Sequence, residues 1–285
     1  KIRKIIINKN EVLNKYKNRI KGGVKFNILK DDINKLIKKF KIDRIVLLSS
    51  ITDPDECLRN KKKSNLINVE KTKKMISKII KQNIYFIFFS SEYIFDGKKG
   101  NYNEKSIVKP INLYGKQKYL IEKYIKNNTK NYCIFRIGKT YGDELNDKTL
   151  ISNFLTNLIK GKKKFYTAND QKFSPLYVKD LKKIVNLFLL KKIKGIFNVG
   201  GPISISRHNC IIKILNCFNK KIKREIVTKK ISFLSIKTLD KRPLNVSMNI
   251  KKLKNNINFK MAKIEDVAKK IIVKYAIDKK ILNRR

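Results

Sequence analysis

The chain has 285 residues, 42% of them hydrophobic, which allows one or two domains with a sizeable core and excludes wholesale disorder. Its longest apolar run, 84–89, is far shorter than the ~20 residues of a membrane span, so we expect no membrane partner. The four cysteines lack the spacing of a zinc ribbon or a disulfide scaffold, so we expect no metal site and a reducing, cytoplasmic setting.

The formal net charge of +48 first suggests a nucleic-acid-binding protein. However, 60 of the 70 basic residues are Lys and only 10 are Arg, whereas base reading favours the Arg fork. The lysines are spread evenly, and the abundance of Lys, Asn and Ile is typical of an A/T-rich gene. We therefore expect a solvated lysine-rich surface and no specific nucleic-acid partner, although a basic groove for a phosphorylated small molecule fits the same charge.

Strand-like apolar runs alternate with helix-length amphipathic segments along the first 200 residues. The runs that predict strands are 5–7, 24–28, 44–49, 84–90, 132–138 and 195–199. The segments that predict helices are 31–40, 65–81, 112–127, 150–160 and 178–190. This alternation is typical of an α/β fold with a doubly wound parallel sheet. After residue 200 the pattern changes, so we predict a larger domain at 1–200 and a smaller α/β lobe at 201–285, to which part of 140–180 contributes.

Small polar side chains follow the predicted strands at the edge where such sheets bind ligands, beyond the carboxyl ends of the strands. Ser49, Ser50 and Thr52 follow one strand, Ser91 ends the next, and Arg136 lies near the end of a third. These residues predict either the floor of a ligand site or caps for the following helices, and the pattern alone leaves both readings open.

Tyr114 and Lys118 stand four residues apart at the start of the predicted helix 112–127, so both side chains lie on one helix face. A nearby cation stabilises a phenolate and is expected to lower the Tyr pKa from its usual value near 10. With a hydroxyl donor, such a pair suits proton exchange with a carbonyl oxygen while a hydride moves at carbon. The same spacing occurs twice more in the chain, but of the three pairs only this one follows a strand end that carries a hydroxyl, Ser91.

The stretch 90–125, SSEYIFDGKKGNYNEKSIVKPINLYGKQKYLIEKYI, resembles the catalytic stretch of the extended short-chain dehydrogenase/reductases. It is most similar to the dTDP-4-dehydrorhamnose reductase type, with its pattern Ser-Thr-Asp-Tyr-Val-Phe-Asp-Gly followed by Pro-x-Asn-x-Tyr-Gly-x-x-Lys. Colinear matches are SSITDPDECLRNKKKSNLINVEKT at 49–72, RIGKTYG at 136–142, DQKFSPLYVKDL at 170–181, GIFNVGG at 195–201 and KRPLNVSMNIKKL at 241–253. The resemblance covers 24–275 and implies a Rossmann-like NAD(P)-binding domain followed by a substrate-binding lobe.

The resemblance also implies a role for each matching residue. The catalytic residues would be Ser91, Tyr114 and Lys118. The residues expected to bind the cofactor are Ser49, Ser50, Thr52, Asn68, Tyr114, Lys118 and Arg136. The residues expected to bind the substrate are Ser91, Glu92, Tyr93 and Arg242.

The implied reaction is the NAD(P)H-dependent reduction of a 4-keto nucleoside-diphosphate sugar, with NADPH or NADH as cofactor. Dehydratases of this superfamily have Thr-Asp-Glu where this chain has Ser91, Glu92 and Tyr93, so reduction is favoured over dehydration. Two alternatives stay open: a nucleotide-sugar epimerase, and a catalytically silent binding protein like the regulatory subunit of methionine adenosyltransferase, which shares these motifs. The resemblance further implies a homodimer that pairs through the helices 65–81 and 112–127.

The chain departs from this family at its start. The family opens with a strand and a Gly-x-x-Gly-x-x-Gly turn that cradles a pyrophosphate, and none of the eleven glycines here forms that motif. Residues 1–8 look like the family's second strand, so we expect the first βα unit, roughly 20–25 residues, to be missing from this sequence. Lys9 stands where NAD-preferring members often have an acid, which favours NADPH.

Overall fold

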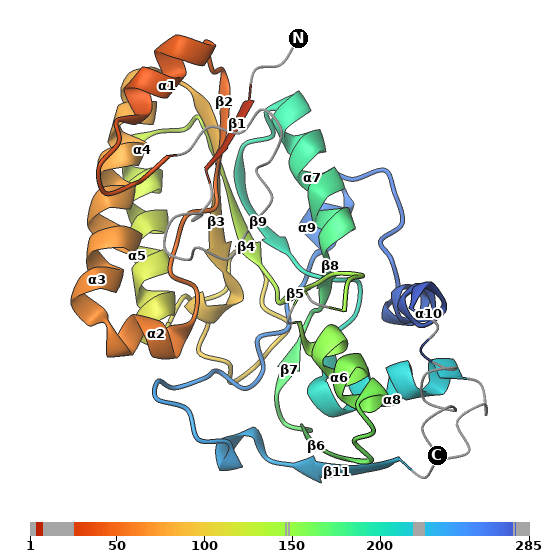
Figure 1. Ribbon diagram of the computed structural model, residues 1–285. Coiled ribbons are helices and arrows are strands. Elements are labelled where there is room, and N and C mark those ends of the chain that lie inside the picture. The colour runs from red at the N-terminus through yellow and green to blue at the C-terminus, as the bar shows by residue number, and fades with distance from the viewer. Residues whose placement is uncertain are drawn as a thin grey trace.

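A five-stranded parallel sheet forms the centre of the molecule (Figure 1). The computed structural model describes residues 4–7 as a strand, and residues 26–145, 147, 149–218, 226–275 and 277. The strand order is β1-β2-β3-β4-β9, and every pair is parallel. The strands are β1 (Lys4–Ile7), β2 (Arg44–Leu47), β3 (Tyr85–Ser91), β4 (Tyr132–Ile137) and β9 (Gly195–Val199). This architecture confirms the predicted α/β class.

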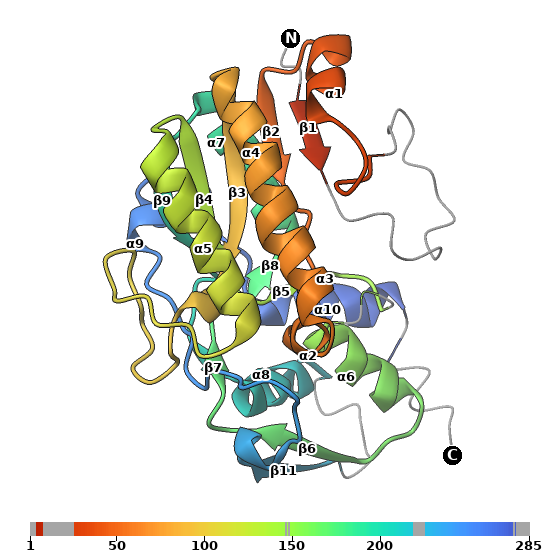
Figure 2. The same cartoon turned by 90° about the vertical axis from the view of Figure 1, so that its left-hand side faces the viewer.

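Helices cover both faces of the sheet. The helices on one face, seen in front of the strands in Figure 2, are α1 (Ile33–Phe40), α2 (Pro54–Arg59), α3 (Lys61–Asn65), α4 (Thr72–Lys81) and α5 (Leu113–Asn128). The helices on the other face are α7 (Val178–Lys191) and α9 (Lys251–Lys254). Side chains alternate along β3, so that Phe86 and Phe88 pack under α4 and α5 while Tyr85 and Ile87 pack under α7. Burial on both faces explains why the strands read as continuous apolar runs.

A second core lies beyond the carboxyl ends of the strands. Its helices are α6 (Leu150–Ile159), α8 (Arg207–Leu215) and α10 (Ile264–Lys274). Its short strands are β5 (Thr140–Tyr141), β6 (Lys164–Ala168), β7 (Lys172–Phe173), β8 (Leu176–Tyr177), β10 (Ile205–Ser206) and β11 (Val227–Ile231). Its apolar cluster joins residues 141–177 with residues 205–277. The segment with Met248, Ile250 and Leu253 packs in the core of the large sheet, although it lies after residue 200. The packing therefore agrees only in part with a domain boundary at residue 200, and that boundary stays a prediction.

The helix predicted at 65–81 is longer than expected and contains a π-helical turn. Helical backbone runs from α3 through η1 (Leu66–Lys71) into α4. The shorter 3-10 turns are η2 (Glu92–Ile94), η3 (Asn216–Phe218) and η4 (Phe233–Ser235). A π-turn inserts one extra residue into a helix and is frequent at functional sites. Here it carries Asn68, whose contacts are described below.

The strand predicted at 24–28 is wrong where the structure describes it. Residues 24 and 25 lie outside the described residues, and 26–30 form a turn. The Asn27 side chain accepts a hydrogen bond from the Leu29 N–H at 2.8 Å, and Asp31 accepts one from the Asn27 N–H. These local bonds satisfy the backbone groups that a strand would pair with a neighbour.

The pairing of β1 differs from the interpretation of residues 1–8 as the family's second strand. The Rossmann fold has the strand order 3-2-1-4-5-6. Here β2, β3 and β4 are neighbours in the sheet in the order of the sequence, so they correspond to strands 4, 5 and 6. β1 lies beside β2 on the other side, which is the position of strand 1 rather than strand 2. Residues 8–25 lie outside the described residues, so the expectations about the glycine turn and Lys9 stay predictions.

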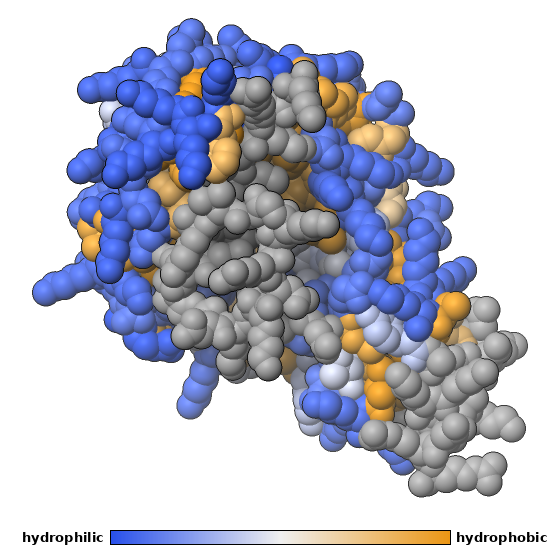
Figure 3. All heavy atoms as spheres, turned by 45° about the horizontal axis from the view of Figure 1, so that its top comes forward, coloured by the Kyte–Doolittle hydropathy of each residue, from blue (hydrophilic) through white to orange (hydrophobic). Residues whose placement is uncertain are grey.

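The surface of the described residues is dominated by hydrophilic side chains on the face seen in Figure 3. Seven cation-bearing side chains form ion pairs in the part of the chain that the structure describes, far fewer than its lysines. Most of the described lysines are exposed to solvent, as the even spread of charge predicts. None of the described helices combines the length and the apolar character that crossing a membrane requires.

The start of α5 depends on a capping contact that we expect to be measurable. The Asn112 side chain accepts from the Gly115 N–H at 2.8 Å and donates to the Lys241 carbonyl at 3.0 Å. Asn112→Ala should lower the free energy of unfolding in urea by about 1 kcal/mol or more. Asn128→Ala, at the exposed end of the same helix, should change it by less than about 0.5 kcal/mol. Equal losses in the two variants would contradict this account of the cap.

Candidate active site

Ser91, Tyr114 and Lys118 come together where β3 ends and α5 begins. Ser91 is the last residue of β3, and the other two lie in the first turns of α5. Their side chains are 8%, 8% and 5% exposed. The Lys118 ammonium donates to the Phe89 carbonyl at 2.8 Å and lies 5.7 Å from the centre of the Tyr114 ring. The structure thus places the three residues predicted to be catalytic in one site.

The pKa of Tyr114 moves in the opposite direction to the one that the sequence predicts. Burial raises it, and a hydrogen bond with Ser91 opposes that rise. Burial also lowers the pKa of Lys118 to about 8, because the charged ammonium loses water. A neighbouring cation alone would lower the pKa of Tyr114, but the folded chain also removes both groups from water.

The loop after β2 is held by Asn68 from the π-turn. The Asn68 carbonyl oxygen accepts from the Ile51 N–H at 2.8 Å and from the Ser50 hydroxyl at 3.0 Å. Ser49 is buried at this edge and Thr52 is exposed. Asn68 also donates to the Gln117 side chain at 2.8 Å, which ties this loop to α5. Sequence reasoning missed Gln117, although its place three residues after Tyr114 puts it on the same helix face.

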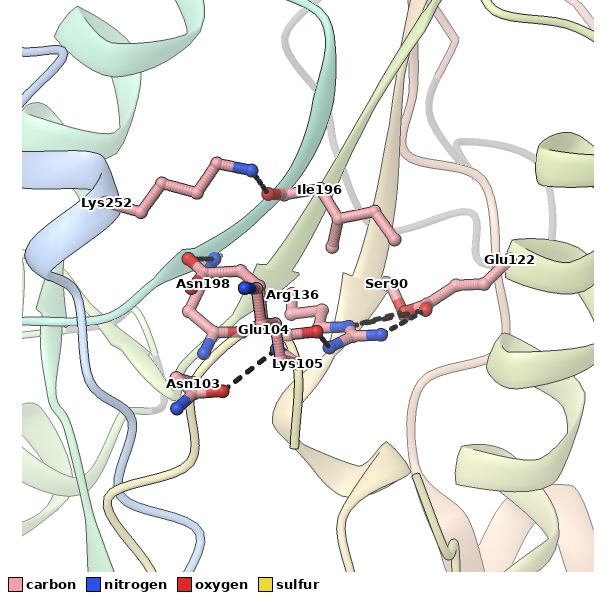
Figure 4. A network of polar contacts seen from close by, with 9 residues as sticks. All are labelled: Ser90, Asn103, Glu104, Lys105, Glu122, Arg136, Ile196, Asn198 and Lys252. Carbon is pink, nitrogen blue, oxygen red and sulfur yellow. Dashed lines mark hydrogen bonds and ion pairs between the residues drawn. The ribbon is translucent and has the colours of Figure 1, made fainter. Parts of the chain in front are cut away.

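Arg136 does not take the position expected of a cofactor-binding residue. Its guanidinium is 4% exposed and forms an ion pair with Glu122 of α5 at 2.9 Å. Another of its N–H groups donates to the Glu104 carbonyl at 3.1 Å. Figure 4 shows the side chain pointing at Glu122, with Ser90 beside them. Arg136 lies in the middle of the sheet layer, where a buried cation needs a buried anion. Glu122 supplies that anion, and so Arg136 points at Glu122.

A charged cluster, made of Glu92, Lys139, Arg207 and Arg242, begins at the residue after Ser91. Glu92 is 4% exposed, and in the described part of the chain its Oε2 atom has no hydrogen-bond partner. Burial raises the pKa of Glu92 to about 8, against the lowering effect of Lys139 and Arg207. Lys139 is exposed, and partial loss of its hydration together with the charge of Arg207 lowers its pKa to about 8. Burial and the Glu92 charge raise the pKa of Tyr93 to about 12.

Arg242 joins this charged cluster to α2 and to the segment around residue 240. Its guanidinium forms an ion pair with Asp55 of α2 at 3.0 Å and donates to the Asp240 carbonyl at 3.1 Å. Asp240 in turn accepts from the Leu113 N–H at 2.9 Å, just before Tyr114. A cavity of about 890 Å³ lies along the same segment, with Ile111, Asp240 and Arg242 in its lining.

Two cations of the charged cluster, Lys139 and Arg207, were not predicted from the sequence. Lys139 follows β4 at the carboxyl edge of the sheet, which is a usable signal. Arg207 begins α8, far along the chain, so only the fold brings it near Glu92. The predicted substrate residues Glu92, Tyr93 and Arg242 do lie in one region, since Arg242 is among the charges that act on Tyr93.

The buried Glu92 predicts a pH-dependent stability. The folded chain holds the Glu92 proton up to about pH 8, whereas the unfolded chain releases it near pH 4.5. The stability from the protonated form is therefore present below pH 4.5 and is lost as the pH rises to about 8. Between pH 5 and pH 8, the free energy of unfolding of the wild type should fall relative to that of Glu92→Gln, by roughly 1.4 kcal/mol for each pH unit.

Urea unfolding at the two pH values measures this difference. Glu70→Gln is the control, because Glu70 is exposed on η1 and should track the wild type at both pH values. A difference between Glu92→Gln and the wild type that stays constant from pH 5 to pH 8 would contradict the proposed burial of the carboxyl group.

Comparisons with known proteins agree on the family. A family model described as RmlD substrate binding domain matches residues 17–277. Methionine adenosyltransferase 2 subunit beta from Xenopus tropicalis is 26% identical over 202 residues, which are 66% of this chain and 58% of that protein. The chain therefore spans less than two thirds of the length of that relative. dTDP-4-dehydrorhamnose reductase from Aggregatibacter actinomycetemcomitans is 25% identical over 235 residues, which cover 79% of this chain and 78% of the relative.

A solved structure supports the same fold. The crystal structure of dTDP-4-dehydrorhamnose reductase from Bacillus anthracis, in complex with NADP, aligns with a TM-score of 0.75 at 21% identity. The alignment covers 87% of this chain and 85% of that one. At this identity the likeness concerns the fold, and the chemistry has to be argued from the residues of this chain.

Proposed function

This chain belongs to the RmlD substrate binding domain family, and from that membership we propose that it reduces a 4-keto nucleoside-diphosphate sugar with NADPH or NADH. The observation that carries the proposal is the meeting of Ser91, Tyr114 and Lys118 at one buried point beyond the end of β3. Ligands of doubly wound sheets bind at this edge. A hydroxyl, a phenol and an ammonium at this edge are the groups that a carbonyl reduction needs.

The residues at this edge fit a nicotinamide cofactor, which supplies a hydride when bound. An ammonium has three donors, and within the described residues Lys118 uses one of them, on the Phe89 carbonyl. The other two are free for ribose hydroxyls beside Tyr114. Ser49, Ser50 and Thr52 have small side chains that leave room at the end of β2, and Asn68 holds their loop. The NADP complex of the Bacillus anthracis protein supports this class of cofactor.

In the proposed reaction the protein handles the proton. Ser91 donates a hydrogen bond to the ketone oxygen, and Tyr114 transfers its phenolic proton to that oxygen as the carbonyl carbon is reduced. The product is the 4-hydroxy sugar, and Tyr114 is left as a phenolate. Because burial raises the pKa of Tyr114, the phenolate needs a nearby cation, and Lys118 in its charged form supplies it.

The charged cluster beside Ser91 suits the nucleotide-sugar end of such a substrate. Lys139, Arg207 and Arg242 are cations that suit a diphosphate, and Glu92 and Tyr93 can hydrogen-bond sugar hydroxyls. Arg242 would exchange Asp55 for a phosphate oxygen. Tyr93 occupies the position at which dehydratases carry a glutamate, which favours reduction over dehydration, with epimerisation as the alternative chemistry of the same site. A homodimer through α4 and α5 belongs to the same proposal.

A second function is favoured by one observation. The relatives named methionine adenosyltransferase 2 subunit beta match this chain at an identity similar to that of the reductase. A catalytically silent binding protein on the same fold is therefore the competing proposal. It predicts a stable complex with a larger enzyme and no oxidation of NADPH or NADH with any 4-keto nucleotide sugar.

Tyr114→Phe tests the reductase proposal. Removing the phenolic oxygen removes the proton donor and keeps the ring, so turnover of a 4-keto nucleotide sugar should fall by about 10²-fold or more. Thermal unfolding should stay close to that of the wild type. Tyr119→Phe is the matched control in the same helix and should retain turnover. Near wild-type rates in Tyr114→Phe would refute the assigned role.

A further inference from the structure

Glu122 continues the row of site residues along α5. Tyr114, Lys118 and Glu122 are spaced by four residues and therefore share one face of the helix. Glu122 is 1% exposed, and neither the sequence analysis nor the proposed chemistry gives it a role. A carboxylate this deeply buried is costly unless it is paired and hydrogen-bonded.

The carboxylate of Glu122 is held by two strands at once. Arg136 of β4 donates from Nη2 to one oxygen at 2.9 Å and from Nε to both oxygens at 3.3 Å. Ser90 of β3 donates its hydroxyl to the other oxygen at 2.5 Å. Figure 4 shows these side chains converging from α5, β3 and β4.

Ser90 lies between the two backbone positions that shape the catalytic point. The preceding residue, Phe89, offers the carbonyl that accepts from Lys118 at 2.8 Å. The following residue is Ser91. Fixing the Ser90 side chain on Glu122 therefore fixes the backbone that aims the Phe89 carbonyl at the ammonium and the Ser91 hydroxyl at Tyr114.

Glu122 is also the charged group that compensates for the burial of Lys118. Burial lowers the pKa of Lys118, and Cys57 and Glu122 raise it. Burial raises the pKa of the Cys57 thiol to about 11, so Cys57 is neutral over the range in which Lys118 titrates. The other groups around the ammonium are the neutral Tyr114 phenol and the Phe88 ring, at 5.0 Å, while Arg136 contacts Glu122. Among the described residues, the compensating negative charge is thus that of Glu122.

We propose that Glu122 is a positioning residue for the reduction. It keeps Lys118 in its charged form, and it holds Ser90 so that Ser91 and the Phe89 carbonyl face the site. The proposal rests on the proposed function. Stability alone does not account for the pair, because well-packed apolar residues can replace a buried ion pair at little or no loss of stability. Apolar residues, however, cannot supply the negative charge one helical turn from Lys118 that keeps its ammonium charged.

Two variants test the proposal. Glu122→Gln removes the charge but leaves Arg136 unpaired, which endangers folding. Glu122→Gln combined with Arg136→Gln removes both charges and keeps two amides that can bond each other. Each is compared with the wild type and with Glu70→Gln, an exposed Glu on η1. The first readout is the titration of the Lys118 ammonium by NMR of ¹⁵N-lysine-labelled protein, with Lys118→Met to identify the signal.

We expect the titration midpoint of Lys118 to fall by about one pH unit or more in both variants and to stay unchanged in Glu70→Gln. With the wild-type midpoint near 8, kcat should then fall about fivefold at pH 8 and stay close to the wild type at pH 6. KM should change by less than about twofold, since the residue does not touch substrate. A purely structural role would instead lower kcat by the same factor at both pH values.

An unchanged Lys118 midpoint in the folded variants would overturn the proposal, and so would an equal loss of kcat at pH 6 and pH 8. The NMR titration needs neither cofactor nor substrate. If the wild type itself shows no turnover, the proposed function fails while the midpoint still decides whether Glu122 keeps Lys118 charged.

Discussion

The contact between α5 and the carboxyl end of β3 is the constraint on which the site depends. Lys118 reaches the Phe89 carbonyl, and Glu122 reaches the Ser90 hydroxyl one helical turn later. Two polar contacts along one helix face fix both the height and the rotation of α5 against the sheet. Because Tyr114 lies on that same face, its place next to Ser91 follows from these contacts. The apolar positions Ile121 and Ile125 continue the packing behind them.

The polar groups of this layer form a connected set rather than isolated pairs. Asn68 joins the loop after β2 to Gln117 of α5, and Arg136 joins β4 to the same helix through Glu122. The π-turn around Asn68 costs regular helical hydrogen bonding, and the five contacts of its amide offset that loss. Two strands, the loop after β2, the π-turn and α5 therefore hold the site by buried hydrogen bonds, a preorganisation that suits chemistry at a carbonyl group.

Much of the fold could be predicted from the sequence because its signals are local. Continuous apolar runs identified β2, β3, β4 and β9, and helical periodicity identified α4 to α7 within a few residues. Two predictions were wrong: a local Asn turn replaced the strand at 26–28, and β1 took a place that only strand pairing decides. The role of Arg136 could not be predicted either, since nothing near it in the sequence indicates that it forms an ion pair with Glu122.

The site residues divide in the same way. The spacing of Tyr114 and Lys118 and the hydroxyl of Ser91 could be recognised from their order along the chain. The direction of the Tyr114 pKa could not, because it depends on how much water the folded chain removes from the phenol. Lys139 is brought to Glu92 by the pairing of β4 with β3, whereas Arg207 comes from a distant segment, and only the packing of the second core against the sheet brings it there.

The most direct test of the account follows the transferred hydrogen. The chain is incubated with NADPH or NADH that carries deuterium on the reducing face of the nicotinamide C4, together with a panel of 4-keto nucleotide sugars. The product is then analysed by mass spectrometry and NMR. The account predicts one deuterium atom at C4 of the product sugar, with one cofactor oxidised per sugar reduced. A folded chain that leaves the label on the cofactor with every sugar of the panel would contradict it and favour the silent binding protein.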